Sequence, residues 1–439
     1  MNEYSNVLKV KLLSLIREMS DACTLYVKNP ESDFIRTRKL PFETVMQLLI
    51  SMGGNSIYKE LLESSGYNIN TATTSAFVQQ RGKILPCAFE FLLHEFTTIH
   101  NSAKTYEGYR IIAADGSDVN ITTNPKDTDT HFQTAPGSKG YNLLHLNALY
   151  DLCNRLYLDA IASPLKICDE RLALETMVDR SRINGKVIVV ADRGYESYNV
   201  FAHIERKGWN YVIRVKDIDS NGILSGLSLP SCSEFDVCVR ITLTKKQTNV
   251  VKAQPEIYKR ISNTQTFDFL DLHDNKFYPM SFRVVRFALP SGLYETVITN
   301  LDANDFPPCK LKYIYKMRWG IETSFRNLKY TIGLVNFHSK KREFIIQEIF
   351  ARLIMYNFTE MTVYHIVIAK SNTKHLYKAN FTVAVHVCRR LLRSKDDEPP
   401  PDVEALISKN ILPVRVLENS NATRKPRIKS VVSFIYRVS

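Results

Sequence analysis

The sequence predicts an α/β fold, in which a mixed sheet carries helices on its faces. One observation is a pair of apolar runs that each end in an aspartate, 110–115 (RIIAAD) and 186–192 (KVIVVAD). Continuous apolar runs of this length are typical of buried strands. The other is the order of the segments between residues 106 and 216: three strands, then helix, strand, helix and strand. We therefore expect one sheet over 106–216, with helices packed against it.

Residues 1–105 precede this core, and their apolar periodicity predicts a helical region. Its apolar-periodic segments are separated by Gly53-Gly54 and Pro86, and they span 42–52, 57–62, 74–83 and 87–96. Basic residues lie at the ends of these segments: Arg36, Arg38, Lys39, Arg81 and Lys83. Two interpretations stay open, a helical bundle with a solvated rim and a DNA-contacting domain.

The core segments place two carboxylates at strand ends. Asp115 ends the first apolar run, and Gly116 is expected to break that strand; Asp192 ends the second, before a turn at 193–195. The remaining segments are strands at 145–151, 155–162 and 209–215 and helices at 170–181 and 198–207. Ligand sites in such sheets gather at the carboxyl ends of strands. If the two strands are neighbours, Asp115 and Asp192 meet.

The sequence pattern changes over residues 217–300, where it predicts a β-rich insertion. Strand-like alternation recurs at 238–244, 280–287 and 295–299. We expect a small sheet beside the site, with basic residues facing a polyanion: Lys245, Lys246, Arg283 and Arg286. Helical patterns return over 301–395, and 396–439 is a basic tail.

Residues 315–329 predict one helix with a polar face. At about 100° per residue, Tyr315, Arg318, Glu322 and Lys329 point the same way. The opposite face is apolar: Ile314, Met317, Ile321, Phe325 and Leu328. Two interpretations are available for the polar face. Glu322 either pairs with Arg318 or Arg326 on a solvated surface, or it binds a metal ion while its neighbours hold phosphates.

Composition narrows the class of protein. Lys and Arg number 58 against 45 for Asp and Glu, a net charge of +13 that favours a polyanionic partner. The eight cysteines show no Cys-x-x-Cys spacing, so we expect reduced thiols, a cytoplasmic setting and no structural zinc. The N-terminus lacks a signal-peptide pattern. The apolar run 345–369 is interrupted by charges, so we expect a buried helix and no membrane partner.

Asp115, Asp192 and Glu322 together predict a two-metal site. Hard divalent cations take oxygen ligands, and Mg²⁺ uses few carboxylates and keeps several waters. Two such ions about 3.5–4 Å apart activate the attacking oxygen and stabilise the leaving oxygen of a phosphoryl displacement. Each aspartate alone is more often a cap or a turn former. The later glutamate with its flanking cations favours the functional interpretation and two Mg²⁺ ions, or Mn²⁺ in their place.

The motifs resemble those of a known family. The spacing Tyr315-x2-Arg318-x3-Glu322-x6-Lys329 resembles the signature of the DDE transposases of bacterial insertion-sequence family four. Asp115-Gly-Ser and Asp192-Arg-Gly-Tyr-Glu-Ser resemble their two aspartate motifs. The segments 33–42 and 424–437 resemble their N-terminal motif and basic ending.

The resemblance implies a ribonuclease-H-like core with a β insertion before the glutamate. It implies cut-and-paste transposition by a homodimer on double-stranded DNA, namely paired transposon inverted-repeat ends and a target, at the bacterial nucleoid. Asp115, Asp192 and Glu322 would be the catalytic metal ligands. Tyr315 and Arg318 would hold phosphates, and Lys329 would steady a terminal phosphate or the carboxylate.

The family also stacks a tryptophan of its insertion on a flipped base, and no tryptophan lies between 217 and 300. Tyr294 or Phe287 would substitute for it, and Trp319 is an alternative that packing explains equally well. Two other functions stay open: another two-metal nuclease of this fold, such as a junction resolvase, and a domesticated DNA-binding protein without activity. The intact carboxylate set argues against the second.

Overall fold

The computed structural model describes residues 3–36, 39–99, 104–135, 137–218, 220–270, 276–366, 377–394 and 399–413. Its helices are α1 Glu3–Asp21, α2 Phe42–Ser51, α3 Ile57–Ser64, α4 Thr74–Arg81, α5 Cys87–Thr98, α6 Glu170–Arg180, α7 Tyr198–Arg206, α8 Asn249–Ala253, α9 Pro308–Met317, α10 Trp319–Arg326, α11 Arg342–Tyr364, α12 Phe381–Arg393 and α13 Val403–Lys409. Its strands are β1 Arg110–Ile121, β2 His131–Phe132, β3 Tyr141–Asp151, β4 Leu156–Pro164, β5 Val187–Ala191, β6 Asn210–Val215, β7 Phe235–Thr244, β8 Tyr258–Arg260, β9 Tyr278–Ala288, β10 Tyr294–Thr299, β11 Tyr377–Ala379 and β12 Ile411–Pro413.

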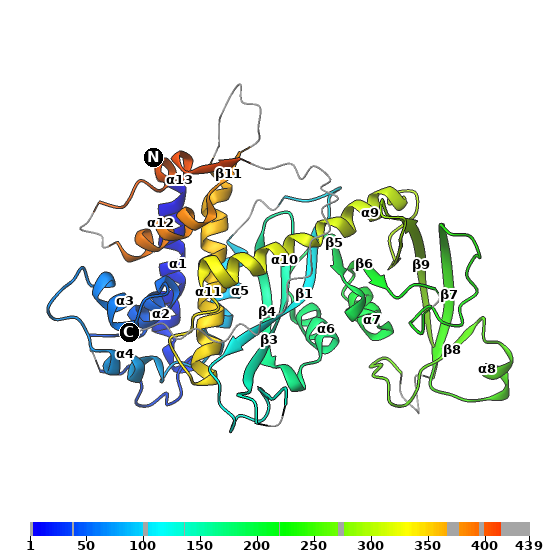
Figure 1. The fold of residues 1–439 in the computed structure, drawn as a ribbon, viewed down its shortest axis with the longest axis horizontal. Coiled ribbons are helices and arrows are strands. Elements are labelled where there is room, and N and C mark those ends of the chain that lie inside the picture. Colours follow the sequence, from blue (N-terminus) through cyan, green and yellow to red (C-terminus); the bar gives the residue numbers. More distant parts are fainter. Residues whose placement is uncertain are drawn as a thin grey trace.

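The core sheet confirms the predicted fold class. Its first five long strands lie in the order β4-β3-β1-β5-β6. Strand β3 is antiparallel to β1 and β4, and β5 is parallel to β1 and β6. This mixed order, with helices on the faces, is consistent with a ribonuclease-H-like fold. Figure 1 shows the sheet in the middle of the molecule, with α6 and α7 beside it and α9 and α10 crossing it.

The insertion strands extend the core sheet, and the expectation of a separate small sheet is wrong. Strand β10 pairs antiparallel with β6, and β9, β7 and β8 follow it, so that the described residues form one ten-stranded sheet. Alternation along a strand shows which face is buried and not which strand is its partner. The predicted boundary at 216 therefore lies between two strands of one sheet, and the division into domains at 105, 216, 300 and 395 stays a prediction.

Apolar side chains cover both faces of the central strands. In β5, Ile188 and Val190 pack with Leu311 and Ile314 of α9 on one face. Val187, Val189 and Ala191 belong to the larger core on the other face, which also contains side chains of α6 and α7. All five residues of β5 are fully buried, so a continuous apolar run is the sequence that this strand requires.

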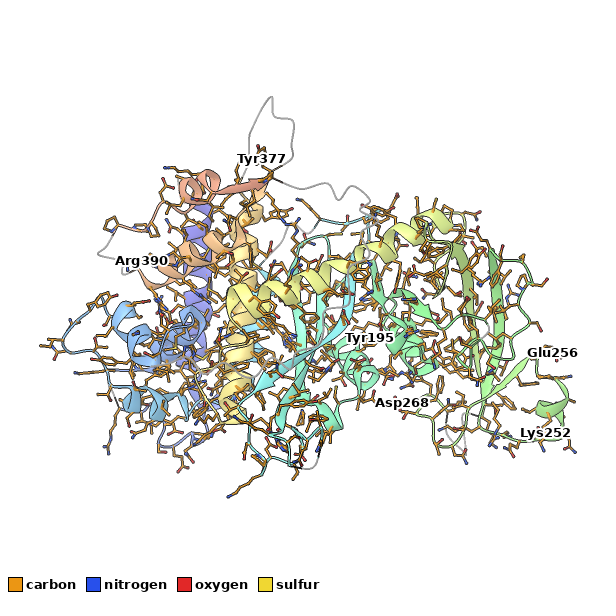
Figure 2. The ribbon with its side chains drawn as sticks, in the orientation of Figure 1. Tyr195, Lys252, Glu256, Asp268, Tyr377 and Arg390 are labelled. Carbon is orange, nitrogen blue, oxygen red and sulfur yellow. The ribbon has the colours of Figure 1, made fainter. Side chains whose placement is uncertain are left out.

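Helix α11 joins the N-terminal helices to the sheet. It packs against α2, α5, α12 and β4, and Figure 1 shows it as the long upright helix between the two parts. The predicted buried helix at 345–369 is this element, and no helix among the described residues is long and apolar enough to cross a membrane. The side chains of Figure 2 fill the space between these elements. The basic residues predicted for the tail, from Arg415 to Arg437, lie outside the described residues.

A buried charge network ties α4 to α11. The Arg81 guanidinium donates to Glu348 and to the Phe344 carbonyl, and Glu348 also meets Arg352 and His338. Burial raises the pKa of Glu348, but His338, Arg81 and Arg352 outweigh burial and lower that pKa to about 2. Arg81 was predicted at a segment end, as part of a solvated rim or of a DNA-contacting surface, and the structure buries it completely.

We predict that Glu348→Gln lowers the free energy of unfolding by about 3–5 kcal/mol at pH 7, because it leaves buried guanidinium groups without a counter-charge. The folded pKa lies below the ordinary value of 4.5, so this stabilisation is complete above about pH 4.5 and is lost as pH falls towards 2. Urea denaturation across that window should show the two proteins converging.

The matched control is Glu343→Gln, which removes a half-exposed surface ion pair with Lys28. It should change stability by about 0.5 kcal/mol or less. A loss below about 1 kcal/mol in Glu348→Gln would show that the network does not hold α4 to α11.

Candidate active site

Strand pairing brings the two aspartates together. Strand β1 pairs in parallel with β5 up to Ala114 opposite Ala191, so Asp115 and Asp192 are the next residues on neighbouring strands. The two strands are therefore neighbours, as the meeting of the two carboxylates requires, and Asp192 is close enough to raise the pKa of Asp115. The expectation that Gly116 ends the strand is wrong, because β1 continues to Ile121 through its antiparallel pairing with β3. Asp115 lies where β1 loses its β5 neighbour and keeps its β3 neighbour.

The tight turn after β5 holds the Asp192 side chain. Asp192 precedes the 3₁₀ turn Arg193–Tyr195, and its carboxylate accepts a hydrogen bond from the Gly194 backbone N–H at 2.8 Å. Arg171 of α6 donates to the Gly194 carbonyl, and the Tyr195 ring is buried beneath the turn, where Figure 2 labels it. The Asp192 carboxylate is therefore fixed by its own backbone.

The third carboxylate reaches the site from α10. The predicted helix 315–329 is present but is divided: α9 ends at Met317, α10 starts at Trp319, and a π-helical turn covers Asn327–Ile332. Gly320 permits close packing here, because a Cβ at that position would lie 2.8 Å from Leu152. The buried Ser324 hydroxyl meets the Tyr157 hydroxyl of β4 at 2.8 Å. These contacts hold the turn that carries Glu322.

Arg318 joins two of the three carboxylates. Its Nη1 lies 3.3 Å from Asp115 Oδ2, and its Nη2 lies 2.8 Å from Glu322 Oε1. The side chain was expected on an exposed polar face, but it is only 7% exposed. Tyr315, expected on that same face, is also buried, beside Arg214. The polar stripe of this helix points into the molecule at the sheet edge, a direction that the helical periodicity alone does not give.

The acidic triad, Asp115, Asp192 and Glu322, is electrostatically strained. Burial raises the pKa of Asp115, Arg318 and the Gly116 N–H lower it, and Asp192 and Glu322 raise it again, to about 6. One guanidinium does not balance three carboxylates, and an all-oxygen donor set of this kind suits Mg²⁺ or Mn²⁺. The triad therefore fits a divalent cation by charge and by donor type. Two other groups of the described residues have possible ligand atoms that all lie within 4.8 Å of one another. The acidic triad is not one of these groups.

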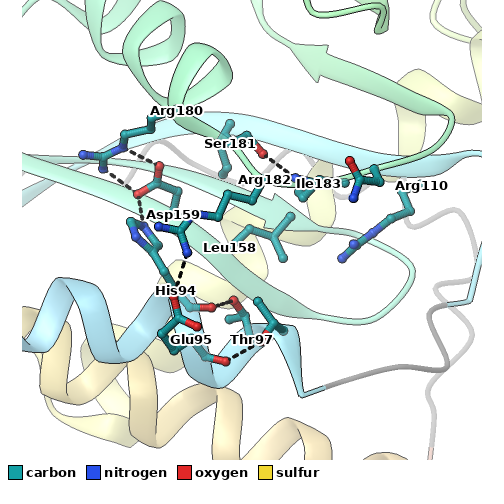
Figure 3. Close-up of a pocket in the computed structure, with 13 residues that line it drawn as sticks. His94, Glu95, Thr97, Arg110, Leu158, Asp159, Arg180, Ser181, Arg182 and Ile183 are labelled. Atoms are coloured by element: carbon teal, nitrogen blue, oxygen red, sulfur yellow. Dashed lines mark hydrogen bonds and ion pairs between the residues drawn. The ribbon is translucent and has the colours of Figure 1, made fainter. Parts of the chain in front are cut away.

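The first of those two other groups is already neutralised, and the second is neutralised only in part. In the first, Arg180 pairs with both Glu90 and Asp159 beside His94. This group borders a cavity of about 230 Å³ whose lining includes Arg110, the first residue of β1, and does not include Asp115 (Figure 3). In the second, Glu175 lies with His203 and Asp268, and His203 also pairs with Asp179. Neither group includes a member of the acidic triad.

A histidine bridge beside the triad was missed by the sequence analysis. His145 of β3 lies 2.7 Å from Asp118 and 2.9 Å from Glu170. Burial lowers the pKa of His145, but the two carboxylates outweigh burial and raise it to about 10. A Cβ on Gly116 would lie 2.1 Å from His145 Nε2, so glycine is required here for close approach. The glycine after Asp115 was the available signal, and it was interpreted as a strand break.

The remaining predicted residues lie around this centre. Lys329 is half-buried in the π-helical turn, where burial lowers its pKa and Asp118 opposes that shift. Tyr294 begins β10 and is 37% exposed, with the Arg286 guanidinium 4.3 Å from its ring centre. Phe287 is buried and cannot replace it as a stacking residue.

The basic residues expected to face a polyanion from the insertion divide into two kinds. Arg283 is buried and pairs with Asp236, and Arg286 pairs with Asp217, so the expectation for these two is wrong. Lys245 and Lys246 are half-buried. Two of these four basic residues therefore form ion pairs within the sheet and are not available to a polyanion.

Comparison with known proteins adds two findings. A family model described as the transposase DDE domain matches residues 106–358, more than half of the chain and a span that contains the whole triad. A cryo-EM structure of a piggyBac transposase synaptic complex with hairpin DNA is similar with a TM-score of 0.45 and 11% sequence identity, over 96% of this chain and 88% of that one. No curated protein sequence matches.

Proposed function

The chain belongs to the transposase DDE domain family, and from this premise we propose that it catalyses cut-and-paste transposition of DNA. The observation that carries the proposal is the β1–β5 register, which sets Asp115 beside Asp192, together with the Arg318 bridge to Glu322. We assign these three carboxylates as the catalytic residues. The substrates are double-stranded transposon ends and a target, held by a homodimer at the bacterial nucleoid.

The family implies a divalent metal, and the acidic triad has the donors to hold it. We propose two Mg²⁺ ions, with Mn²⁺ as a replacement, held by Asp115, Asp192 and Glu322. When bound, such ions polarise the phosphoryl group and lower the pKa of an attacking water or 3′-hydroxyl.

The chain's own residues prepare the site for a phosphate. The Gly116 and Gly194 N–H groups orient the two aspartates, and Ser324 with Tyr157 fixes the height of α10 above the sheet. Arg318 screens Asp115 from Glu322 and is close enough to both to turn towards a phosphate. Lys329 supplies a second cation about two turns beyond Glu322. The buried Tyr315 ring lies beside Arg318, with its centre 5.8 Å from the guanidinium.

We predict that Asp115→Asn, Asp192→Asn and Glu322→Gln each reduce metal-dependent strand cleavage by more than about 100-fold, since even outer partners of metal ligands are worth roughly 10–100-fold. DNA binding should remain. The substrate is the genomic segment that flanks this reading frame, and the assay is strand cleavage on denaturing gels.

Glu107→Gln, which removes a surface ion pair with Lys310, is the control and should cleave normally. Near-normal cleavage by any one of the three triad variants would remove that residue from the catalytic set.

Lys329 should contact a phosphate. Lys329→Ala is predicted to weaken DNA binding and to make the fall of log K with log salt less steep by about 0.9, the value of one contact. The measurement is fluorescence anisotropy across a salt series without metal. Lys28→Ala, on the surface pair with Glu343, is the control. Arg318→Ala should likewise weaken binding and make the slope less steep by about 0.9. An unchanged slope for both variants would give both cations a structural role, Arg318 as the buried partner of Asp115 and Glu322.

Tyr294 remains our candidate for stacking on a displaced base during second-strand cleavage. Tyr294→Ala should leave the first nick at its normal rate and slow the second cut about 10–100-fold, the range of one base–aromatic stack. Tyr294→Phe keeps the ring and should behave like the native protein. If Tyr294→Ala makes both cuts at the native rates, the ring does not stack on a base, and its role is limited to its contact with Arg286.

A further inference from the structure

Helices α6 and α7 and the insertion bring a second set of possible metal ligands together. Glu175 and Asp179 lie one turn apart on α6, and His203 lies on α7, which packs against α6. Asp268, labelled in Figure 2, joins them from the segment between β8 and β9. We call these four residues the α6–α7 cluster. The cluster links the core to the insertion and shares no residue with the acidic triad.

The cluster contains three carboxylates and one imidazole. His203 lies between two of the carboxylates, with Nδ1 2.9 Å from Asp179 and Nε2 3.0 Å from Asp268. No lysine or arginine that the structure describes forms an ion pair with any of the three acids. Lys207 donates to the backbone carbonyl of Asp179, and Lys245 acts on Asp268 through space without pairing with it. A single imidazole, even when it is protonated, therefore leaves negative charge unbalanced.

Glu175 is the buried acid of the cluster. It is only 5% exposed, and no cation in the described part of the chain forms an ion pair with it. Burial raises the pKa of Glu175 to about 7, although a hydrogen bond from Asn199 and the charge of His203 oppose that shift. A buried acid without a full counter-charge is costly in the folded state. Glu175 also lines a cavity of about 650 Å³ between α6, α7 and the insertion, through which a cation can reach it.

The spacing of these groups fits a bound cation. Possible ligand atoms of Glu175, His203 and Asp268 all lie within 4.8 Å of one another. Zinc lies about 2.0–2.2 Å from its nitrogen and oxygen ligands, so two ligands of one ion are about 3–4 Å apart. The 3.0 Å between His203 Nε2 and Asp268 Oδ2 is such a distance. Asp179, at the other ring nitrogen, lies where an outer carboxylate orients a metal-binding histidine.

The other group of this kind already has its positive charge. Glu90, His94 and Asp159 offer the same three types of side chain, but Arg180 pairs with both of their carboxylates. The α6–α7 cluster has no such guanidinium among the described residues. Its donors also differ from those of the acidic triad, because an imidazole nitrogen suits zinc and its neighbours in the first transition row, whereas an all-oxygen set suits Mg²⁺.

We propose that Glu175, His203 and Asp268 form a zinc site, oriented by Asp179, that fixes the insertion to α6 and α7. The ion takes the imidazole Nε2 and two carboxylates, with water in its remaining positions. The expectation of no structural zinc rested on cysteine spacing, which does not report a site built from carboxylates and a histidine. This site is separate from the acidic triad, and the inference does not depend on the proposed function.

Zinc binding in the presence of excess Mg²⁺ tests the proposal, because Mg²⁺ occupies the triad and competes poorly for an imidazole. The full chain is stripped of metal with a chelator and titrated with zinc chloride by calorimetry. Asp268→Asn and His203→Ala should each weaken zinc binding by more than about 100-fold. Asp179→Asn removes only the outer partner and should weaken it by about 10–100-fold. Asp268 is 49% exposed, so its replacement leaves the core intact.

The matched control is His94→Ala, which removes the same type of ligand from the group that Arg180 neutralises. It should bind zinc as the native protein does. Replacing zinc with Co²⁺ adds a spectroscopic control for the eight cysteines. The visible cobalt bands should disappear in Asp268→Asn, and thiolate charge-transfer bands should be absent from the native protein.

Glu175→Gln gives a stability measurement whose sign depends on the ion. Without metal, this variant should keep or raise the Tm of the native protein, because it removes a buried charge that lacks a full counter-charge. With free zinc at about 100 times Kd, the native protein should gain about 3 °C, and Glu175→Gln should gain nothing. A structural role for Glu175 without zinc would give the same difference in Tm under both conditions.

Two results would overturn the proposal. If the native protein binds no zinc in the presence of Mg²⁺, the three acids are held by a protonated His203 alone. If zinc binding survives unchanged in Asp268→Asn and His203→Ala, the ion lies elsewhere on the chain. Should His203→Ala fail to fold, the two exposed positions, Asp268 and Asp179, decide the question. Neither result bears on the proposed function, because neither measures DNA cleavage.

Discussion

The parallel pairing of β1 with β5 is the constraint on which the site depends. Ala114 lies opposite Ala191, so the next residue of each strand carries a carboxylate at the same level. A slip by one residue would send one of the two aspartates to the other face of the sheet. Burial of all five β5 side chains against helices on both faces makes such a slip expensive. The apolar runs before each aspartate therefore fix the geometry of the polar site.

Bringing carboxylates together in a half-buried place carries an electrostatic penalty, and the structure shows how it is offset. Asp115 has its pKa raised to about 6 by burial and by the other two acids, in spite of Arg318. Arg318 lies between α9 and α10, where the helix is interrupted. Its buried side chain contacts both Asp115 and Glu322. The His145 bridge offsets a similar repulsion between carboxylates beside the triad, because a cationic imidazole lies between Asp118 and Glu170.

Much of this arrangement could be predicted from the sequence, because buried strands and amphipathic helices leave strong local patterns. Such patterns give the core segments, the two buried runs that precede Asp115 and Asp192, and the apolar side of the 315–329 helix. The pairing of β10 with β6 joins segments some eighty residues apart, and no local pattern records it. The role of Gly116 was misjudged for the same reason, since the group that it avoids, His145, lies on another strand. Periodicity likewise showed that Tyr315 and Arg318 share a face, but not that this face is turned towards the sheet.

The helix that carries Glu322 has three sides, and each satisfies a different requirement. Its apolar side packs into the core, its polar side meets the strand ends, and its third side exposes Trp319 and Arg326. A helix on the surface of a globular protein ordinarily needs only two sides, one buried and one solvated by charge. Because Glu322 pairs with Arg318 on the inner side, Arg326 on the outer side forms no ion pair with any residue that the structure describes. The internal ion pair is therefore what leaves the outer surface positive beside the triad.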